Sequence, residues 1–196
     1  MLFALLQKEI KLFGTYKMHS QKVNIVEKFK RGVLGFVFLF AFSYLSAQSC
    51  NPNIPLATPN NRFTIINDGT VVDKKTGLMW MRCSLGQSWD GNGCSGLSTN
   101  FSWIEAINAG ENSSFANHSD WRVPNIKELA SILEDACYEP AINETIFPST
   151  TEKYFWSSSP HAVDSADQQY LDFVVGDIYP PSSFNFLAVR LVKNAP

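Results

Sequence analysis

Short apolar or alternating runs, separated by turn residues, predict a series of strands beyond residue 60. The runs that we expect to form strands are residues 62–66, 70–73, 78–82, 154–158, 169–175, 178–179 and 187–192. Asp68-Gly69, between the first two runs, is typical of a tight hairpin turn. Two helical segments lie between the early and the late strands. This order favours an α+β domain whose two ends meet in one sheet.

The stronger of the two helical signals lies in residues 120–129. Pro124 disfavours a helical conformation in the residue before it, so the chain enters the segment extended. Asn125 and Glu128 have the spacing of a capping box, in which each side chain accepts a hydrogen bond from the other residue's backbone amide. We therefore expect a helix over residues 126–136. A shorter helix is predicted over residues 101–109, where the apolar side chains at helical spacing are Trp103, Ile104 and Ile107.

Residues 33–45 form an apolar, uncharged run that is too short to cross a membrane. As a helix it would be about 20 Å long, whereas the hydrocarbon core of a bilayer is about 30 Å thick. The run follows Lys28, Lys30 and Arg31 and precedes Leu45-Ser46-Ala47. This order is typical of a secretory signal peptide over residues 1–47, cleaved after Ala47, with Met18 as an alternative start. An uncleaved membrane anchor is the competing interpretation.

Removal of this leader changes the charge of the chain. Residues 1–47 contain seven of the 16 Lys and Arg residues and two of the 18 Asp and Glu residues, which leaves nine bases and 16 acids, a net charge of −7, in residues 48–196. Such an acidic domain repels polyanions, so we expect no nucleic-acid partner. Residues 48–61 contain three prolines and predict an extended lead-in, and residues 62–193 are long enough for one domain with its own core.

All four cysteines lie beyond the leader, as Cys50, Cys83, Cys94 and Cys137. An even number of cysteines in an exported chain predicts two disulfide bonds and an oxidising compartment. Of the three pairings we favour Cys83–Cys94, because the Gly-rich stretch between these residues closes easily, and by elimination Cys50–Cys137. A structural zinc site is the alternative. The chain has neither a CxxC pair nor a histidine cluster, so we expect no such metal.

The five tryptophans divide into predicted core residues and candidate ligand contacts. Trp80, Trp121 and Trp156 lie within the strongest motifs, and we expect them to be buried with hydrogen-bonded indole N–H groups. Trp89 and Trp103 lie on or beside the long polar loop 84–100 and are the candidate ligand-facing aromatic residues.

Two arginines, Arg122 and Arg190, interrupt apolar stretches. An arginine beside buried aromatic residues usually donates hydrogen bonds to a carboxylate or to backbone carbonyls, so we interpret both as structural. The candidate carboxylate partners are Asp120, Asp73 and Glu128.

Oxygen-bearing side chains near the C-terminus could bind calcium. They are Asp164, Asp167, Asp172, Asp177 and Asn185, of which Asp164, Asp167 and Asn185 are also candidate ligand contacts. Their spacing matches no EF-hand loop, and solvated surface carboxylates are the alternative interpretation. The chain contains no G-x-S-x-G, HExxH or phosphate-loop motif, so we expect neither an enzyme nor a catalytic residue.

Several separated motifs occur in an order that is not generic. They are Asp68-Gly69-Thr70-Val71, Lys75-Thr76-Gly77-Leu78-Met79-Trp80-Met81-Arg82-Cys83, Asp120-Trp121-Arg122-Val123-Pro124-Asn125-Ile126-Lys127-Glu128-Leu129, Tyr154-Phe155-Trp156-Ser157-Ser158-Ser159 and Val189-Arg190-Leu191-Val192. Over residues 62–193 this order resembles the C-terminal domain of the bacterial collagen-like adhesin Lcl. The resemblance implies a C-type-lectin-like fold, of the class shared with formylglycine-generating enzymes, and a secreted, periplasmic or cell-surface location. In the adhesin itself it implies a trimeric domain that binds sulfated polysaccharide.

The chain departs from that adhesin in two respects. It lacks collagen repeats, so a homotrimer rests on the resemblance alone, and its acidic charge does not suit a sulfated ligand. We expect an exported, lectin-like binding or adhesion module whose loops 84–100 and 161–186 contact a polysaccharide or a surface protein. The alternatives are an enzyme related to formylglycine-generating enzymes, which would use a reactive cysteine pair, and an envelope scaffold without a small ligand.

Overall fold

A computed structural model describes residues 48–151, 153–160, 168–179 and 186–196. The predicted leader, residues 1–47, and three candidate ligand residues, Asp164, Asp167 and Asn185, lie outside the described residues. The described part combines antiparallel sheets with two short α-helices. It is therefore of the predicted α+β class.

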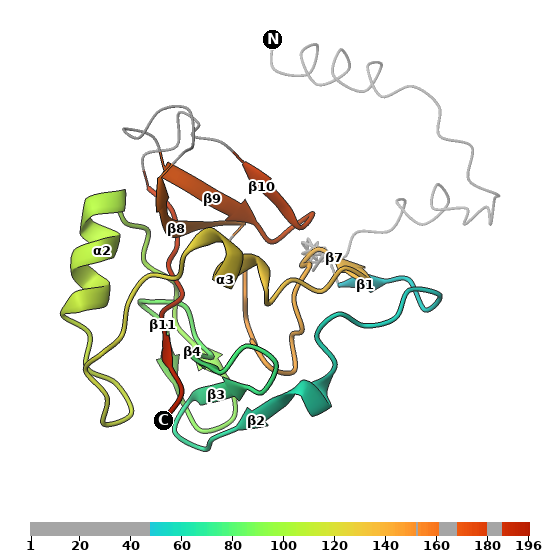
Figure 1. Ribbon diagram of the computed structural model, residues 1–196, viewed down its shortest axis with the longest axis horizontal. Coiled ribbons are helices and arrows are strands. Elements are labelled where there is room, and N and C mark those ends of the chain that lie inside the picture. Colours follow the sequence, from blue (N-terminus) through green and yellow to red (C-terminus); the bar gives the residue numbers. More distant parts are fainter. Residues whose placement is uncertain (1–47, 152, 161–167, 180–185) are drawn as a thin grey trace, which may run out of the picture. The chain divides into compact units, whose positions relative to one another are not determined.

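The main sheet joins the beginning of the domain to its end (Figure 1). Its four antiparallel strands are, in order, β11 (Val192–Asn194), β4 (Leu78–Met81), β3 (Thr70–Asp73) and β2 (Phe63–Ile65). The predicted turn between β2 and β3 is stabilised by Asp68, whose carboxylate accepts hydrogen bonds from the Thr70 amide at 2.9 Å and the Thr70 hydroxyl at 2.7 Å. The two ends of the domain meet in one sheet, as the order of predicted strands indicates.

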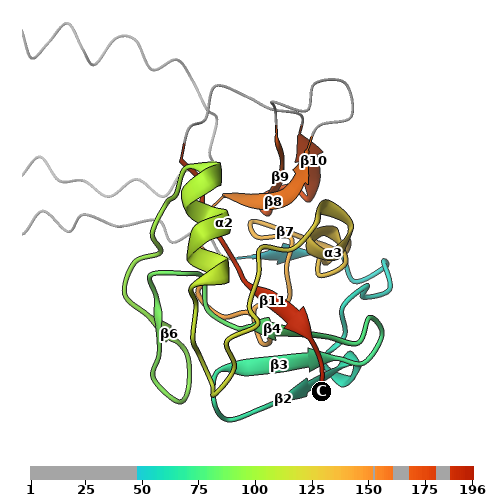
Figure 2. The same ribbon diagram turned by 60° about the vertical axis from the view of Figure 1, so that its left-hand side comes forward.

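A second antiparallel sheet contains, in order, β10 (Asp177–Tyr179), β9 (Gln168–Asp172) and β8 (Tyr154–Pro160). Helix α3 (Ile126–Ala130) lies between this sheet and the main sheet, and helix α2 (Trp103–Glu111) lies beside β8 (Figure 2). Two short strand pairs complete the described structure. They are β1 (Ser49–Cys50) with β7 (Cys137–Tyr138), and β5 (Ser88–Trp89) with β6 (Cys94–Ser95).

Both helices begin at a capping box. In α3 the Asn125 side chain accepts from the Glu128 amide at 2.9 Å, and the Glu128 carboxylate accepts from the Asn125 amide at 2.8 Å. This helix ends at Ala130, well before the predicted end at residue 136. The chain instead pairs with a later segment, because the Glu134 amide donates to the Ala141 carbonyl at 3.0 Å. Tertiary backbone pairing therefore takes precedence over the apolar periodicity that continues beyond Ala130.

The predicted strand 187–192 also differs from the observed structure. Leu187 and Ala188 form isolated bridges with Phe101 and Phe155, and the regular strand β11 begins only at Val192. Successive residues of this segment thus pair with separate parts of the domain, so they form no continuous ladder with a single partner strand.

The three tryptophans expected in the core are all buried. Trp80 belongs to one apolar cluster, and Trp121 and Trp156 belong to a second. The indole N–H groups of Trp121 and Trp156 donate to the carbonyls of Phe115 at 3.1 Å and Phe101 at 2.7 Å. The Trp80 indole nitrogen is buried without a hydrogen-bond partner among the described residues, which differs from the expectation.

The lead-in, residues 48–61, is fastened to the segment that follows α3. The disulfide bond Cys50–Cys137 joins β1 to β7, as predicted from the sequence. Further along, the buried Glu134 carboxylate accepts hydrogen bonds from the Ala57 amide at 3.0 Å and from the Thr58 amide and hydroxyl at 2.9 and 2.8 Å. The lead-in ends in a short 3₁₀ helix, Asn60–Arg62. These contacts order a segment that has little regular structure of its own.

A buried ion pair fixes the beginning of the main sheet to its second strand. Arg62 donates to both carboxylate oxygens of Asp73, at 2.7 and 2.5 Å, and the Asp73 side chain is fully buried. Burial opposes ionisation of Asp73. Hydrogen bonds from Arg62, Thr76 and Lys75 outweigh that effect and lower the pKa of the carboxyl below its usual range. Asp73 is therefore ionised throughout the neutral range.

We expect the substitution Asp73→Asn to lower the free energy of unfolding by about 3 kcal/mol at neutral pH, because it leaves the Arg62 charge buried without its partner. A carboxyl whose pKa is lower in the folded than in the unfolded state stabilises the fold at pH values above its unfolded-state pKa. This stabilisation is lost as the pH falls through the folded-state pKa. The variant should therefore lose less stability than the wild type on acidification. Urea denaturation from neutral to acidic pH measures both effects.

The control is Glu111→Gln, at an exposed carboxylate at the end of α2. It should be neutral within about 0.5 kcal/mol. Equal stability of all three proteins at neutral pH would contradict the structural role given to Asp73.

Candidate ligand-binding site

A pocket of about 360 Å³ lies where the end of β4, the β5–β6 hairpin and the segment after α2 meet. We call it the loop pocket. It is lined by Met81, Cys83, Ser84, Leu85, Gln87, Ser88, Trp89, Ser113, Ser114 and Phe115. None of these residues is charged, and the lining combines two aromatic side chains with four serines and a glutamine. The pocket is thus amphipathic and electrically neutral at its surface.

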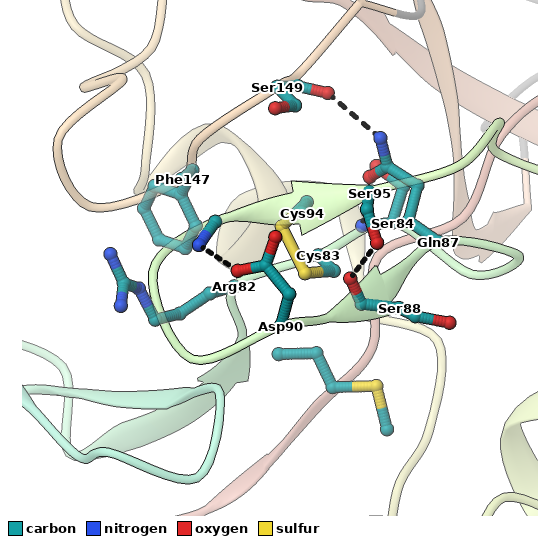
Figure 3. The surroundings of a disulfide bond; sticks show 12 residues. Arg82, Cys83, Ser84, Gln87, Ser88, Asp90, Cys94, Ser95, Phe147 and Ser149 are labelled. Atoms are coloured by element: carbon teal, nitrogen blue, oxygen red, sulfur yellow. Dashed lines mark hydrogen bonds between the residues drawn. A yellow bond between two sulfur atoms is a disulfide. The ribbon is translucent and has the colours of Figure 1, made fainter.

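The second predicted disulfide bond, Cys83–Cys94, closes the hairpin that carries one wall of this pocket (Figure 3). The Asp90 carboxylate orders the tip of the hairpin by accepting hydrogen bonds from the amides of Asn92 at 2.9 Å and Gly93 at 2.8 Å. These bonds lower the pKa of Asp90. Gln87 ties the base of the hairpin to the neighbouring chain through a bond from its Nε2 to the Ser149 carbonyl at 3.1 Å. The hairpin within the polar loop is therefore held both at its tip and at its base.

Arg82 supports Trp89 from behind the pocket wall. Its guanidinium carbon lies 4.3 Å from the centre of the Trp89 ring, which is the geometry of a cation–π contact. The guanidinium also donates to the carbonyls of Ile146 and Thr145, both at 2.9 Å. Arg82 is buried, and this burial lowers its pKa. One face of the half-buried indole is thus fixed against a cation.

Arg190 is a second buried cation beside the loop pocket, with no exposed surface. It donates to the carbonyls of Met81 and Arg82, to the Thr150 hydroxyl at 2.8 Å and to the Ser84 hydroxyl at 3.4 Å. Burial lowers the pKa of Arg190 to about 9, so it remains charged at neutral pH. In the described part of the chain, none of the ion pairs includes Arg82 or Arg190. Two cations without carboxylate partners therefore lie behind a neutral wall.

Gly69 sets the position of the two aromatic side chains. Its φ of +89° lies in the left-handed region, and a Cβ atom at this position would lie 2.7 Å from Trp89 Cγ and 2.9 Å from Phe115 Cζ. Such distances are too short for carbon atoms that are not bonded, so only glycine allows the β2–β3 turn to pack against both rings.

The structure places the residues that the sequence singled out as follows. Trp89 lies in the loop pocket. Trp103 does not line this pocket; it lies at the start of α2, and its indole N–H donates to the Ser157 carbonyl at 2.9 Å. Arg122 forms a fork with Glu128, with both distances 2.7 Å, so Glu128 is its partner among the three candidate carboxylates. Arg190 uses carbonyls and hydroxyls in place of a carboxylate.

Sequence reasoning did not identify the opposite wall of the pocket, Ser113, Ser114 and Phe115, or the support from Arg82. These residues are distant in sequence from Trp89 and share no motif with it. The one local signal was Gly69, because a glycine in a hairpin turn can also indicate a close approach of another group.

Two of the candidate calcium ligands are described. Asp172 and Asp177 are directly opposed across β9 and β10, and Asp172 is buried, 3.6 Å from the Lys153 ammonium. Among the described residues, no group of three or more His, Cys, Asp or Glu side chains is placed to hold a metal ion. The other three candidates lie outside the described residues.

We expect Gly69→Ala to displace Trp89, because the new methyl group occupies the space of the indole. Backbone strain at the positive φ adds a destabilisation of about 1–3 kcal/mol. The indole resonance of Trp89 in a proton–nitrogen NMR spectrum should shift or broaden. Gly77→Ala is the matched control, since Gly77 also has a positive φ, +69°, but has nothing within 4 Å of the added Cβ. If both variants leave the Trp89 resonance unchanged, the turn does not position this side chain.

The fold and site together define a small α+β domain, stapled by two disulfide bonds, with one neutral, aromatic loop pocket supported by buried arginines. Residues 69–193 match the family described as the Lcl C-terminal domain, and the chain belongs to this family. It is thus a domain of the type found in adhesin-like proteins. The comparison with curated proteins and the comparison with solved structures give no match.

The two disulfide bonds indicate an oxidising compartment and therefore an exported or extracellular protein. No helix among the described residues has the length and apolar character needed to span a membrane.

Proposed function

We propose that this domain binds carbohydrate at the loop pocket, as the recognition module of an exported, adhesin-like protein. The observation that carries the proposal is the composition of the pocket wall, in which Trp89 and Phe115 stand beside serine hydroxyls and the Gln87 amide. A sugar ring presents C–H groups on its faces and hydroxyls at its edge, so it needs both kinds of contact. The volume of the pocket lies in the range of small-ligand sites.

The buried arginines favour a sugar that carries an acidic group. Arg82 and Arg190 place positive charge one side chain behind the pocket, and the low dielectric of the protein interior strengthens their field. The domain is acidic as a whole, but a ligand in the pocket experiences mainly the nearest charges. A uronate or sulfate group is therefore compatible with this site, although the net charge alone argues against a polyanion.

Binding without catalysis is the reading that we propose. An enzyme of the formylglycine-generating type would use a reactive cysteine pair, whereas all four cysteines of this chain lie in the two disulfide bonds. Each disulfide fastens a loop or the lead-in to the body of the domain, which gives it a structural use. The proposed partner is a polysaccharide, and the site as proposed requires no bound cofactor.

A glycan array with neutral, uronate-containing and sulfated sugars tests this function on the purified, disulfide-bonded protein, with calcium and without it. We expect saturable binding, with acidic sugars ranked above neutral ones. Trp89→Ala should weaken it about ten-fold, because the stacking surface is lost. Ile104→Ser is the control, at a residue of α2 that is 68% exposed and does not line the pocket. Binding to no glycan, or equal loss in both variants, would argue against this function.

A further inference from the structure

The register of the second sheet places two rows of side chains on one of its faces. Directly opposed residues of antiparallel strands point to the same face. The first row is Tyr154, Asp172 and Asp177, and the second row is Trp156, Tyr170 and Tyr179. Ring contacts agree with this arrangement, since Tyr170 and Tyr179 are stacked with centroids 5.7 Å apart. An acidic row thus lies beside an aromatic row.

Only the outer part of these rows is accessible. Trp156, Tyr170 and Asp172 are buried, Tyr154 is half-buried, and Tyr179 is 36% exposed. Asp177 is exposed at the start of the edge strand β10. We call the set Tyr154, Asp172, Asp177 and Tyr179 the tyrosine–aspartate face. It contains two tyrosine–aspartate pairs: Tyr154 with Asp172 on the opposite strand, and Tyr179 with Asp177 on the same strand.

The first pair already binds a cation within the molecule. The Lys153 ammonium lies 4.8 Å from the centre of the Tyr154 ring and 3.6 Å from a carboxylate oxygen of Asp172. A hydrogen bond with Tyr154, followed by the charge of Asp172, raises the pKa of Lys153. An aromatic ring and a carboxylate at this spacing therefore accept an ammonium group on this face.

The second pair, Tyr179 and Asp177, makes no ion pair or cation–π contact among the described residues, although the charge of Lys153 also acts on Tyr179. None of the ion pairs within the described residues includes Asp177. The sequence from 152 to 186 contains five acidic residues, a single lysine, which is Lys153, and no arginine. The pKa of the Tyr179 phenol is raised, first by burial and then by the charges of Asp177 and Asp172, which outweigh the opposite effect of Lys153. The local field is negative, and this part of the chain supplies no further base to neutralise it.

We propose that the Tyr179–Asp177 pair docks a lysine or arginine side chain from a basic segment of a partner protein, as Tyr154 and Asp172 hold Lys153. This surface is separate from the loop pocket, since the two share no residue. The partly exposed ring of Tyr179, which stacks on Tyr170, offers a cation–π contact, and the Asp177 carboxylate offers an ion pair. Charge complementarity selects a basic partner over an acidic polysaccharide at this face.

Titration calorimetry with an acetylated, amidated tetralysine peptide tests the proposal, at an ionic strength of about 50 mM so that screening is weak. We expect saturable binding to the purified, disulfide-bonded protein. Asp177→Asn and Tyr179→Ala should each raise the Kd about two- to five-fold, the range that single exposed contacts of these kinds give. Tyr179→Phe should bind like the wild type, because it keeps the ring.

Two controls separate a specific surface from the general attraction of an acidic domain. Asp135→Asn removes the same charge from an exposed residue outside this face and should leave the Kd unchanged. Trp89→Ala should also leave it unchanged, since it alters only the loop pocket. The proposal is overturned if Asp135→Asn weakens the peptide as much as Asp177→Asn does, if Trp89→Ala abolishes binding, or if the titration shows no saturable binding.

Discussion

The fully buried guanidinium of Arg190 is the constraint on which the loop pocket depends. A buried cation without a carboxylate is tolerated only when oxygen acceptors surround it. Here the carbonyls of Met81 and Arg82 and the hydroxyls of Ser84 and Thr150 supply acceptors for the two terminal nitrogens, whereas Nε has no hydrogen-bond partner among the described residues. These hydrogen bonds therefore fix the corner at which β4 ends and the long loop begins. The pocket wall starts at that corner.

Hydrogen bonds to buried or turn carboxylates, together with the two disulfide bonds, hold the other irregular segments of the chain in place. The Glu134 carboxylate secures the lead-in, the Asp90 carboxylate secures the hairpin tip, and each disulfide bond closes one of these segments. Regular strands in this domain are short, so backbone ladders alone would leave the loops free to move. The apolar clusters form the core of the domain, and these hydrogen bonds and disulfide bonds fix the positions of its loops.

The sequence predicted those features that depend on neighbouring residues. The capping box at Asn125, the turn at Asp68-Gly69 and the closure of the Gly-rich loop by Cys83 and Cys94 all have local causes, and the structure contains each of them. The early end of α3 was not predictable, because it results from pairing with residues near Ala141. The pocket was only partly predictable. Trp89 has a recognisable loop context, whereas Phe115 joins it through the packing of a turn from another part of the chain.

The most direct test of the role of Arg190 is amide hydrogen exchange in Arg190→Lys. A lysine keeps the charge but presents its donors at one atom, so it cannot reach acceptors on both sides of the corner. Exchange at Leu85, whose amide donates to Val189, should become faster relative to exchange at Val72 in β3. Unchanged relative rates at these two amides would contradict the claim that the buried Arg190 holds the corner from which the wall of the loop pocket begins.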